Sequence, residues 1–152
     1  MARARYQVLV LPYKKLDGKI RYCIFKRSDM DAWQFIAGGG EDEDASPLNS
    51  AKREAYEEAG IPFDAKYDAL ETKCSISTEC FKEARLVWGG SCLVIPEHCF
   101  AVEIADEKIE LSSEHVNFEW VEYQTAVQRL KYDSNKVALW ELDNKIKLGM
   151  LS

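Results

Sequence analysis

The chain has 152 residues, of which 47% are hydrophobic, 30% charged and 11% aromatic, and its net charge is −6. This length suits one domain that buries most of its apolar surface, and the composition excludes a disordered or fibrous chain. The negative charge argues against a general nucleic-acid-binding surface. No apolar run approaches the ~20 residues of a membrane helix and no signal peptide is evident. We therefore expect a cytoplasmic protein that binds neither membranes nor nucleic acid polymers.

Short apolar runs separated by turn residues predict strands in chain order before and after one central helix. Ser46 is a favoured N-cap, Pro47 suits the first helical position and Gly60 suits the residue after the last turn. Asp133 or Ser134 can cap the last helix. Trp33–Ala37 is a short apolar stretch before the glycines at 38–40. The predicted strands are Tyr6–Leu11, Ile20–Lys26, Tyr67–Ser77, Ala84–Trp88, Ser91–Ile95, Cys99–Ile104 and Val116–Val121, and the predicted helices are Pro47–Ala59, Tyr123–Lys131 and Asn135–Leu148. This order predicts an α+β fold in which residues 1–152 form a single domain.

The cysteines lack the spacing of a metal site or a disulfide framework. Their number is odd, and no pair has the C-x-x-C spacing. Several lie in apolar runs, where a reduced cysteine behaves as a small core residue. We therefore expect free thiols and a reducing compartment. The five positions are Cys23, Cys74, Cys80, Cys92 and Cys99.

Most of the negative charge lies in one segment. Residues 41–60 contain seven acidic and two basic residues, so the other 132 residues carry a net charge of only −1. In the predicted helix, Glu54, Glu57 and Glu58 have the spacing that brings side chains to one face. Either solvent or a divalent cation can relieve their repulsion, and Mg²⁺ prefers such carboxylate oxygens together with substrate phosphates. Three glycines just upstream, at 38–40, allow a sharp bend or a close approach to a ligand.

This segment resembles the Nudix box, G-x5-E-x7-R-E-U-x-E-E-x-G-U, where U is apolar. Gly39 has the position of the first glycine, and residues 53–61 (REAYEEAGI) match the second half. The resemblance implies a Nudix α/β/α sandwich with a mixed sheet. It also implies a hydrolase that breaks a phosphoanhydride bond in a nucleoside diphosphate linked to another group.

The resemblance also implies roles for individual residues. Glu57 and Glu58 would bind the divalent metal, Mg²⁺ or Mn²⁺, and Glu54 would contribute to metal binding or act as the base. Arg53 would orient a glutamate, and the glycine loop at Gly39 and Gly40 would contact the substrate. Phosphoryl transfer requires mainly positioning and charge neutralisation, which metal ions supply.

One fixed position of the box differs in this chain. Ala45 stands where the first glutamate is expected. The loss of a carboxylate should weaken metal binding, unless Glu43 or Asp44 reaches the same space through a shifted loop. This difference leaves a non-catalytic nucleotide-binding Nudix module as an alternative function.

Two patterns outside the box resemble the dihydroneopterin triphosphate (dATP) pyrophosphohydrolase branch of the family. One is KRSD at 26–29 followed by Trp33-Gln34, and the other is SEHVNFEW at 113–120. The resemblance implies that Arg27 and Trp33 contact the substrate and that Glu114 is a further metal ligand or the base. From residue type alone, Arg27 can instead end a strand at the surface, and Trp33 can pack in the core.

Diadenosine polyphosphate hydrolases share the second pattern. The stretch Ile36-Ala37-Gly38 lacks the proline and lysine expected in those enzymes, which favours the triphosphate branch. We therefore expect a Mg²⁺-dependent pyrophosphohydrolase that converts a small nucleoside or pterin triphosphate to the monophosphate and pyrophosphate. A diadenosine polyphosphate hydrolase is the runner-up.

Overall fold

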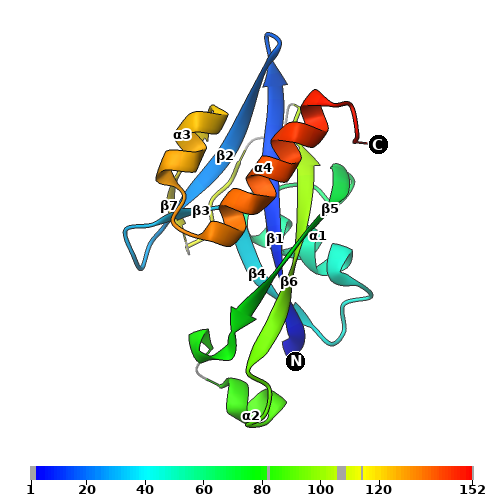
Figure 1. The fold of residues 1–152 in the computed structure, drawn as a ribbon, viewed down its shortest axis with the longest axis vertical. Coiled ribbons are helices and arrows are strands. Elements are labelled where there is room, and N and C mark those ends of the chain that lie inside the picture. The colour runs from blue at the N-terminus through cyan, green and yellow to red at the C-terminus, as the bar shows by residue number, and fades with distance from the viewer. Residues whose placement is uncertain (1–2, 82, 106–108, 114, 152) are drawn as a thin grey trace.

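The computed structural model describes residues 3–81, 83–105, 109–113 and 115–151, and within them a seven-stranded mixed sheet lies between helices (Figure 1). The strands are β1 (Arg3–Leu16), β2 (Lys19–Arg27), β3 (Trp33–Gln34), β4 (Ile36–Glu41), β5 (Lys66–Ser77), β6 (Val94–Glu103) and β7 (His115–Val121). The helices are α1 (Pro47–Ala59), the 3-10 turn η1 (Thr78–Cys80), α2 (Ala84–Trp88), α3 (Tyr123–Arg129) and α4 (Asp133–Lys147).

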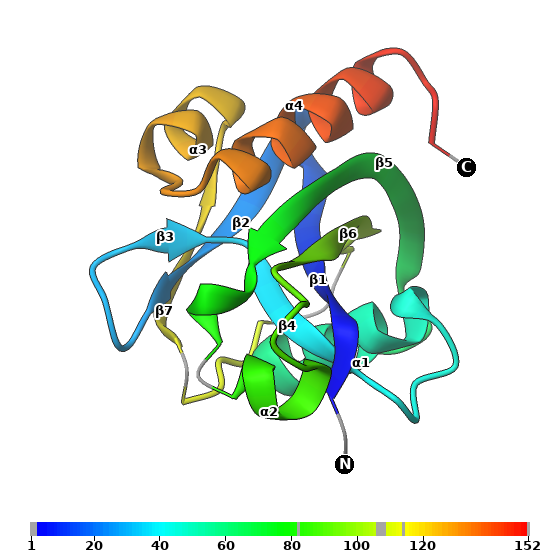
Figure 2. The ribbon, with the colours of Figure 1, turned by 60° about the horizontal axis from the view of Figure 1, so that its bottom comes forward.

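The long strand β1 organises the sheet. The strand order is β3-β2-β1-β6-β5, with β4 also paired to β1 and β7 to β2. The β1–β6 pair is parallel and places Gln7 opposite Glu97, whereas the other pairs are antiparallel. Helix α1 covers one face, while α3 and α4 cover the other (Figure 2). The predicted α+β sandwich with a mixed sheet is thus confirmed.

Alternation along β1 builds a hydrophobic core on each face of the sheet. Val8 and Val10 are fully buried in the cluster that includes α1, and Leu9 and Leu11 are fully buried in the cluster that includes α3 and α4. Successive side chains of a strand point to opposite faces, so a strand buried on both sides must be apolar at every position. The first of these cores holds α1, which carries the acidic residues, against the sheet.

The ends of α1 follow the sequence prediction. The Ser46 hydroxyl accepts a hydrogen bond from the Asn49 backbone N–H at 3.2 Å, and Pro47 occupies the first turn. At the other end, Gly60 has φ of 70° and donates its N–H to the Tyr56 carbonyl at 2.9 Å. These caps satisfy backbone groups that a helix leaves unpaired, and they fix where the helix begins and ends.

Replacing Gly60 by alanine should lower the free energy of unfolding by about 1–2 kcal/mol, because a Cβ is disfavoured in the left-handed region. The added Cβ would also lie 3.2 Å from the Cβ of Glu110. Gly90→Ala is the matched control, since its Cβ would meet no heavy atom within 4 Å. Urea unfolding of both variants measures the difference, and equal stabilities would contradict the role of Gly60 as a helix stop.

The predicted strand Ala84–Trp88 is wrong, because this segment is the short helix α2. Its buried residues, Ala84 and Trp88, are four positions apart, while Leu86 between them is 87% exposed. That is helical periodicity, but a five-residue segment is too short to show it from sequence. The segment then docks on β1, where the Trp88 indole N–H donates to the Arg3 carbonyl at 2.9 Å.

The predicted bounds of three other elements are also wrong, because they were placed at proline residues or at residues that often cap helices. Strand β1 continues through Pro12 to Leu16. Strand β6 runs from Val94 through Pro96 to Glu103, so it joins the last two residues of the predicted strand Ser91–Ile95 to most of the predicted strand Cys99–Ile104. Pro96 precedes the stretch that pairs with β1, where a missing N–H is tolerated. Neither Asp133 nor Ser134 caps α4, because the N-cap position is Tyr132 and no side chain makes a cap hydrogen bond.

All five cysteines are free thiols. Cys23 and Cys99 are buried, as predicted for small core residues, while Cys74 and Cys92 are half-buried and Cys80 is exposed. Over the residues that the structure describes, no helix combines the length and the apolar character needed to cross a membrane.

Candidate active site

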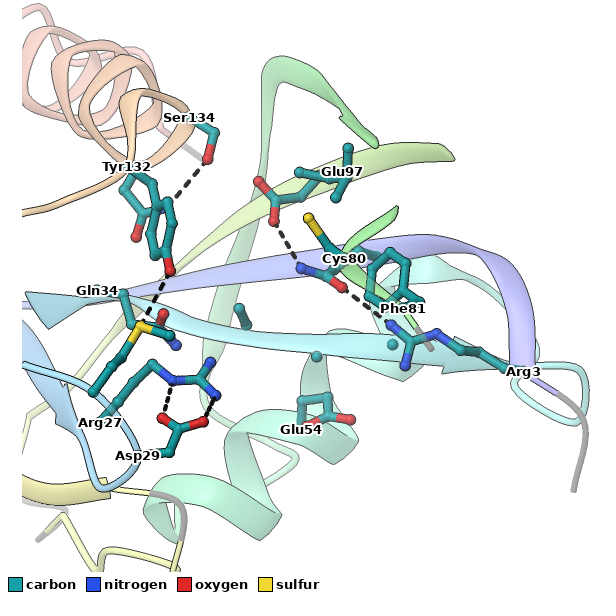
Figure 3. Close-up of a pocket in the computed structure, with 17 residues that line it drawn as sticks. Arg3, Arg27, Asp29, Gln34, Glu54, Cys80, Phe81, Glu97, Tyr132 and Ser134 are labelled. Carbon is teal, nitrogen blue, oxygen red and sulfur yellow. Dashed lines mark hydrogen bonds and ion pairs between the residues drawn. The ribbon is translucent and has the colours of Figure 1, made fainter. Parts of the chain in front are cut away.

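A cavity of about 720 Å³ lies beside the box helix, where several elements converge (Figure 3). Its lining includes Arg3 and Gln7 of β1, Gly38 and Gly39 of β4, and Glu54 of α1. The other lining residues come mainly from β2, β3, β5, η1, β6 and the start of α4. This volume falls in the range of small-molecule sites, which are typically about 300–1,000 Å³.

The glycines of β4 allow the box helix to approach the sheet. A Cβ at Gly38 would overlap the Glu54 carboxylate, and one at Gly39 would overlap the Arg3 guanidinium. A Cβ at Gly40 would instead meet the Tyr6 ring. Gly38 and Gly39 therefore create space for charged groups of the cavity, whereas Gly40 makes room for packing.

Arg53 connects the glycine strand to the carboxylates of the box. Its Nη2 donates to the Gly39 carbonyl at 3.0 Å and to Asp44 Oδ2 at 2.9 Å. Its Nη1 donates to Glu54 Oε1 at 3.0 Å and reaches Glu57 Oε2 at 3.5 Å. Its pKa is raised, chiefly by the hydrogen bond with Asp44. The guanidinium thus links the Glu54 carboxylate to the Gly39 carbonyl.

Asp44 provides the negative charge next to Arg53 where the box glutamate is missing. Ala45 is exposed, whereas the Asp44 carboxylate is mostly buried and accepts from Arg53 and, at 2.6 Å, from the Ser50 hydroxyl. Burial raises the pKa of Asp44, but hydrogen bonds from Arg53 and Ser50 outweigh it, so the pKa lies below its usual range. Glu43 is exposed. The geometry favours Asp44 as the substitute.

Glu54 is a carboxyl group with a strongly shifted pKa. Burial raises its pKa to about 7, and Glu57 and Glu58 contribute in the same direction, while Arg53 opposes the shift. A nearby cation would relieve this desolvation and repulsion. Such a perturbed carboxyl group in a cavity is a frequent mark of a functional site.

The raised pKa of Glu54 predicts a pH-dependent stability. The group titrates near 4.5 when unfolded and near 7 when folded, so without Mg²⁺ its contribution to stability is lost as the pH rises through about 7. Melting temperatures in EDTA should therefore decline more steeply from pH 5 to 8 in the wild type than in Glu54→Gln. Saturating Mg²⁺ should reduce that decline. Identical pH slopes of the two proteins would contradict the raised pKa.

Glu57 and Glu58 occupy different environments on α1. The Glu57 side chain is 52% exposed, whereas that of Glu58 is 7% exposed and accepts from the Ser112 hydroxyl at 2.6 Å. His115 Nδ1 lies 3.5 Å from the Glu58 carboxylate. Among the described residues, no three acidic, histidine or cysteine side chains gather closely enough to hold a metal as they stand. Glu114, which is predicted as a further metal ligand or the base, lies outside the described residues.

The donor chemistry nevertheless fits a hard divalent cation. Three carboxylates project from successive turns of one helix, and burial, together with repulsion from Glu57 and Glu58, raises the pKa of Glu54. Mg²⁺ prefers such oxygen ligands. Among the residues that the structure describes, Glu57 forms one ion pair, with Arg53 at 3.5 Å, and half-exposed pairs of this kind contribute little to stability. The side chain of Glu57 can therefore turn toward Glu54 at low cost.

Only some of the residues that were predicted to contact the substrate line the cavity. Arg27 lines the cavity and forms a bidentate salt bridge with Asp29, in which Nε donates to Oδ1 and Nη2 donates to Oδ2, each at 2.6 Å. Gly39 also lines it, but Trp33 and Gly40 are not among the described lining residues. Trp33 packs against the core under α3 and α4, and its ring lies 5.7 Å from the Arg129 guanidinium. Strand alternation instead turns Gln34 toward the cavity.

Sequence reasoning did not find three further polar residues of the cavity, namely Arg3, Gln7 and Glu97. The Arg3 guanidinium lies 4.4 Å from the centre of the Phe81 ring and faces the Glu54 side of the cavity. Burial lowers its pKa, and Glu54 opposes this shift. These residues come from the two parallel strands β1 and β6, and a parallel register over this distance has no local signal in the sequence.

The chain matches known proteins over nearly its whole length. The NUDIX domain profile matches residues 6–140. A dihydroneopterin triphosphate diphosphatase from Haemophilus influenzae is 32% identical over 133 residues, which are 87% of this chain and 83% of that protein. The chain therefore belongs to the NUDIX family. The expectation of a Nudix hydrolase that most resembles the dihydroneopterin triphosphate branch is confirmed.

Solved structures agree with this assignment. A structure from Listeria monocytogenes assigned to the NUDIX hydrolases has a TM-score of 0.87 and 37% identity, and the match covers 98% of this chain and 99% of that one. The Escherichia coli dihydroneopterin triphosphate pyrophosphohydrolase has a TM-score of 0.73 and 22% identity, with coverage of 94% and 99%. The second likeness shows the shared fold.

Proposed function

We propose that this chain is a Mg²⁺-dependent pyrophosphohydrolase that cleaves a pterin or nucleoside triphosphate to the monophosphate and pyrophosphate. The observation that carries the proposal is the convergence of Glu54, Arg3 and the glycine strand on one cavity of substrate size. The similarity to a dihydroneopterin triphosphate diphosphatase supports the triphosphate as substrate. The five free cysteines suit a cytoplasmic enzyme.

Carboxylates of the box helix would hold the metal. Glu54, Glu57 and Glu58 are the proposed ligands, with Glu114 as a further ligand or the base. Bound Mg²⁺ would neutralise phosphate charge and make the attacking water a better nucleophile. Arg53 acts as a positioning residue, because it fixes the Glu54 carboxylate relative to the Gly39 carbonyl.

Two arginines at the cavity would bind the phosphates. Arg3 lines the cavity next to Gly39 and Glu54, and Arg27 lines it at another wall (Figure 3). Guanidinium groups suit phosphate oxygens because they donate two parallel hydrogen bonds and stay charged. Arg27 would exchange its pairing with the half-exposed Asp29 for a phosphate.

A substrate panel tests the proposal. Dihydroneopterin triphosphate, dATP, other nucleoside triphosphates and diadenosine tetraphosphate are incubated with Mg²⁺ or EDTA, and the products are separated by ion-exchange chromatography. We expect Mg²⁺-dependent release of pyrophosphate from a triphosphate. Preference for diadenosine tetraphosphate would replace this function by the runner-up. Tight nucleotide binding without turnover would favour the non-catalytic module.

A further inference from the structure

Glu97 is a buried carboxyl group that the proposed reaction does not use. Its residue is 2% exposed and it lines the cavity, yet Oε1 has no hydrogen-bond partner among the described residues. Leaving a buried carboxyl oxygen unpaired costs free energy, so buried polar atoms are nearly always bonded. An unpaired oxygen at a cavity wall is therefore a candidate contact for a ligand.

The neighbours of Glu97 fix which oxygen stays open. Arg3 Nη2 donates to Gln7 Oε1 at 3.1 Å, which leaves the amide nitrogen of Gln7 facing β6. That nitrogen donates to Glu97 Oε2 at 3.3 Å. In Figure 3 the other carboxylate oxygen of Glu97 points away from Gln7. The chain Arg3–Gln7–Glu97 thus orients a hydrogen-bond acceptor in the cavity.

The surroundings of Glu97 suit a flat heterocycle. Burial raises the pKa of Glu97, while the Gln7 amide and the nearby Ser134 hydroxyl favour the carboxylate form. The cavity wall also contains the side chains of Ile76, Phe81 and Tyr132. Figure 3 shows Glu54 and Glu97 on different walls of the cavity. A substrate that places its phosphates near Glu54 can therefore extend its ring system toward Glu97.

We propose that Glu97 is a specificity-determining residue that accepts hydrogen bonds from the 2-amino-4-oxopyrimidine edge common to pterin and guanine. This edge presents a ring N–H beside an amino group. Oε1 can accept from one of these donors, and Oε2, which keeps a lone pair beside its bond from Gln7, can accept from the other. Adenine presents an amino group beside an acceptor nitrogen, which a carboxylate repels. The inference rests on the proposed function for the orientation of the substrate, and it names the substrate class of the same site.

Binding without turnover tests the role of Glu97. Neopterin, GMP, IMP and AMP are titrated into the metal-free protein by fluorescence or calorimetry. We expect Glu97→Gln to weaken the binding of neopterin and GMP by about 10- to 100-fold, while the affinity for AMP changes little. A good bidentate hydrogen-bond pair gives discrimination of this size. Glu103→Gln on the same strand, where Glu103 pairs with Lys66 at 4.0 Å, is the control and should bind as the wild type.

The wild-type ligand series keeps the test decisive even if Glu97→Gln does not fold. IMP lacks the 2-amino group of GMP, so it should bind more weakly than GMP. A folded Glu97→Gln with wild-type affinity for neopterin and GMP, or a wild type that prefers AMP or IMP to GMP, would overturn the inference.

The relative affinities of neopterin and GMP separate the two possible ring systems. If Glu97→Gln hydrolyses triphosphates with the same preference among ring systems as the wild type, the role of Glu97 is overturned but the proposed function is not. Absence of any triphosphate hydrolysis by the wild type would overturn the proposed function, and the binding series would still decide the role of Glu97.

Discussion

Glu57→Gln should lower kcat/KM for triphosphate hydrolysis by at least about 100-fold, since even residues that only support metal ligands cost 10–100-fold when lost. The substitution keeps the shape of the side chain but removes a negative charge from the proposed Mg²⁺ site. Glu57 is 52% exposed and pairs with Arg53 at 3.5 Å, so the melting temperature should hardly change. Steady-state rates over a Mg²⁺ series, together with thermal melts, measure both effects.

Asp42→Asn is the matched control for Glu57→Gln. It removes one negative charge from the same acidic segment at an exposed position of the loop before α1. The control should retain wild-type turnover, which would separate loss of a ligand from a general change in electrostatic potential. A folded Glu57→Gln with an unchanged rate would contradict the metal site on this helix.

Local signals explain why the box helix could be predicted residue by residue. The N-cap at Ser46, the proline in the first turn and the left-handed Gly60 each depend only on residues close by in the chain. Helix α1 spans Pro47–Ala59 as expected. The spacing of Glu54 and Glu57 likewise depends only on helix geometry. Such features need no knowledge of the tertiary fold.

Long-range contacts explain what the sequence did not reveal. Arg3 and Glu97 are far apart in the chain, and they meet at one cavity through Gln7 and the parallel register of β1 and β6. Trp33 matched a family pattern, but the pleat of β3 turns its neighbour Gln34 to the cavity. The side of a strand that faces a site depends on pairing, which residue type alone does not define.

The departure from the Nudix box at Ala45 shows how a tertiary contact can replace a motif residue. The sequence leaves two expectations open: Ala45 weakens the metal site, or a neighbouring acid substitutes. The structure favours the second, because Asp44 contacts Arg53 Nη2 at 2.9 Å while Ala45 is exposed. The charge that holds Arg53 is therefore present one residue earlier in the chain.

Asp44→Asn should consequently lower turnover or raise the Mg²⁺ concentration for half-maximal activity by about 10–100-fold, as for other residues that support a metal ligand. The amide removes the charge that Arg53 pairs with, and Arg53 then holds Glu54 less firmly. Mg²⁺ titrations of activity measure the shift, and thermal melts separate it from any loss of stability.

Ala45→Glu is the variant that distinguishes the two expectations. Arg53 already has Asp44 as its partner, and a side chain at position 45 starts from an exposed site, so the Mg²⁺ requirement should stay at the wild-type value. If Asp44 substitutes for the missing glutamate, the double variant Asp44→Asn with Ala45→Glu should regain the activity that Asp44→Asn loses. In the double variant Arg53 lacks the Asp44 carboxylate, so the new carboxylate at position 45 can pair with it. A lower Mg²⁺ requirement in Ala45→Glu alone, with no effect of Asp44→Asn, would show instead that the gap in the box is unfilled.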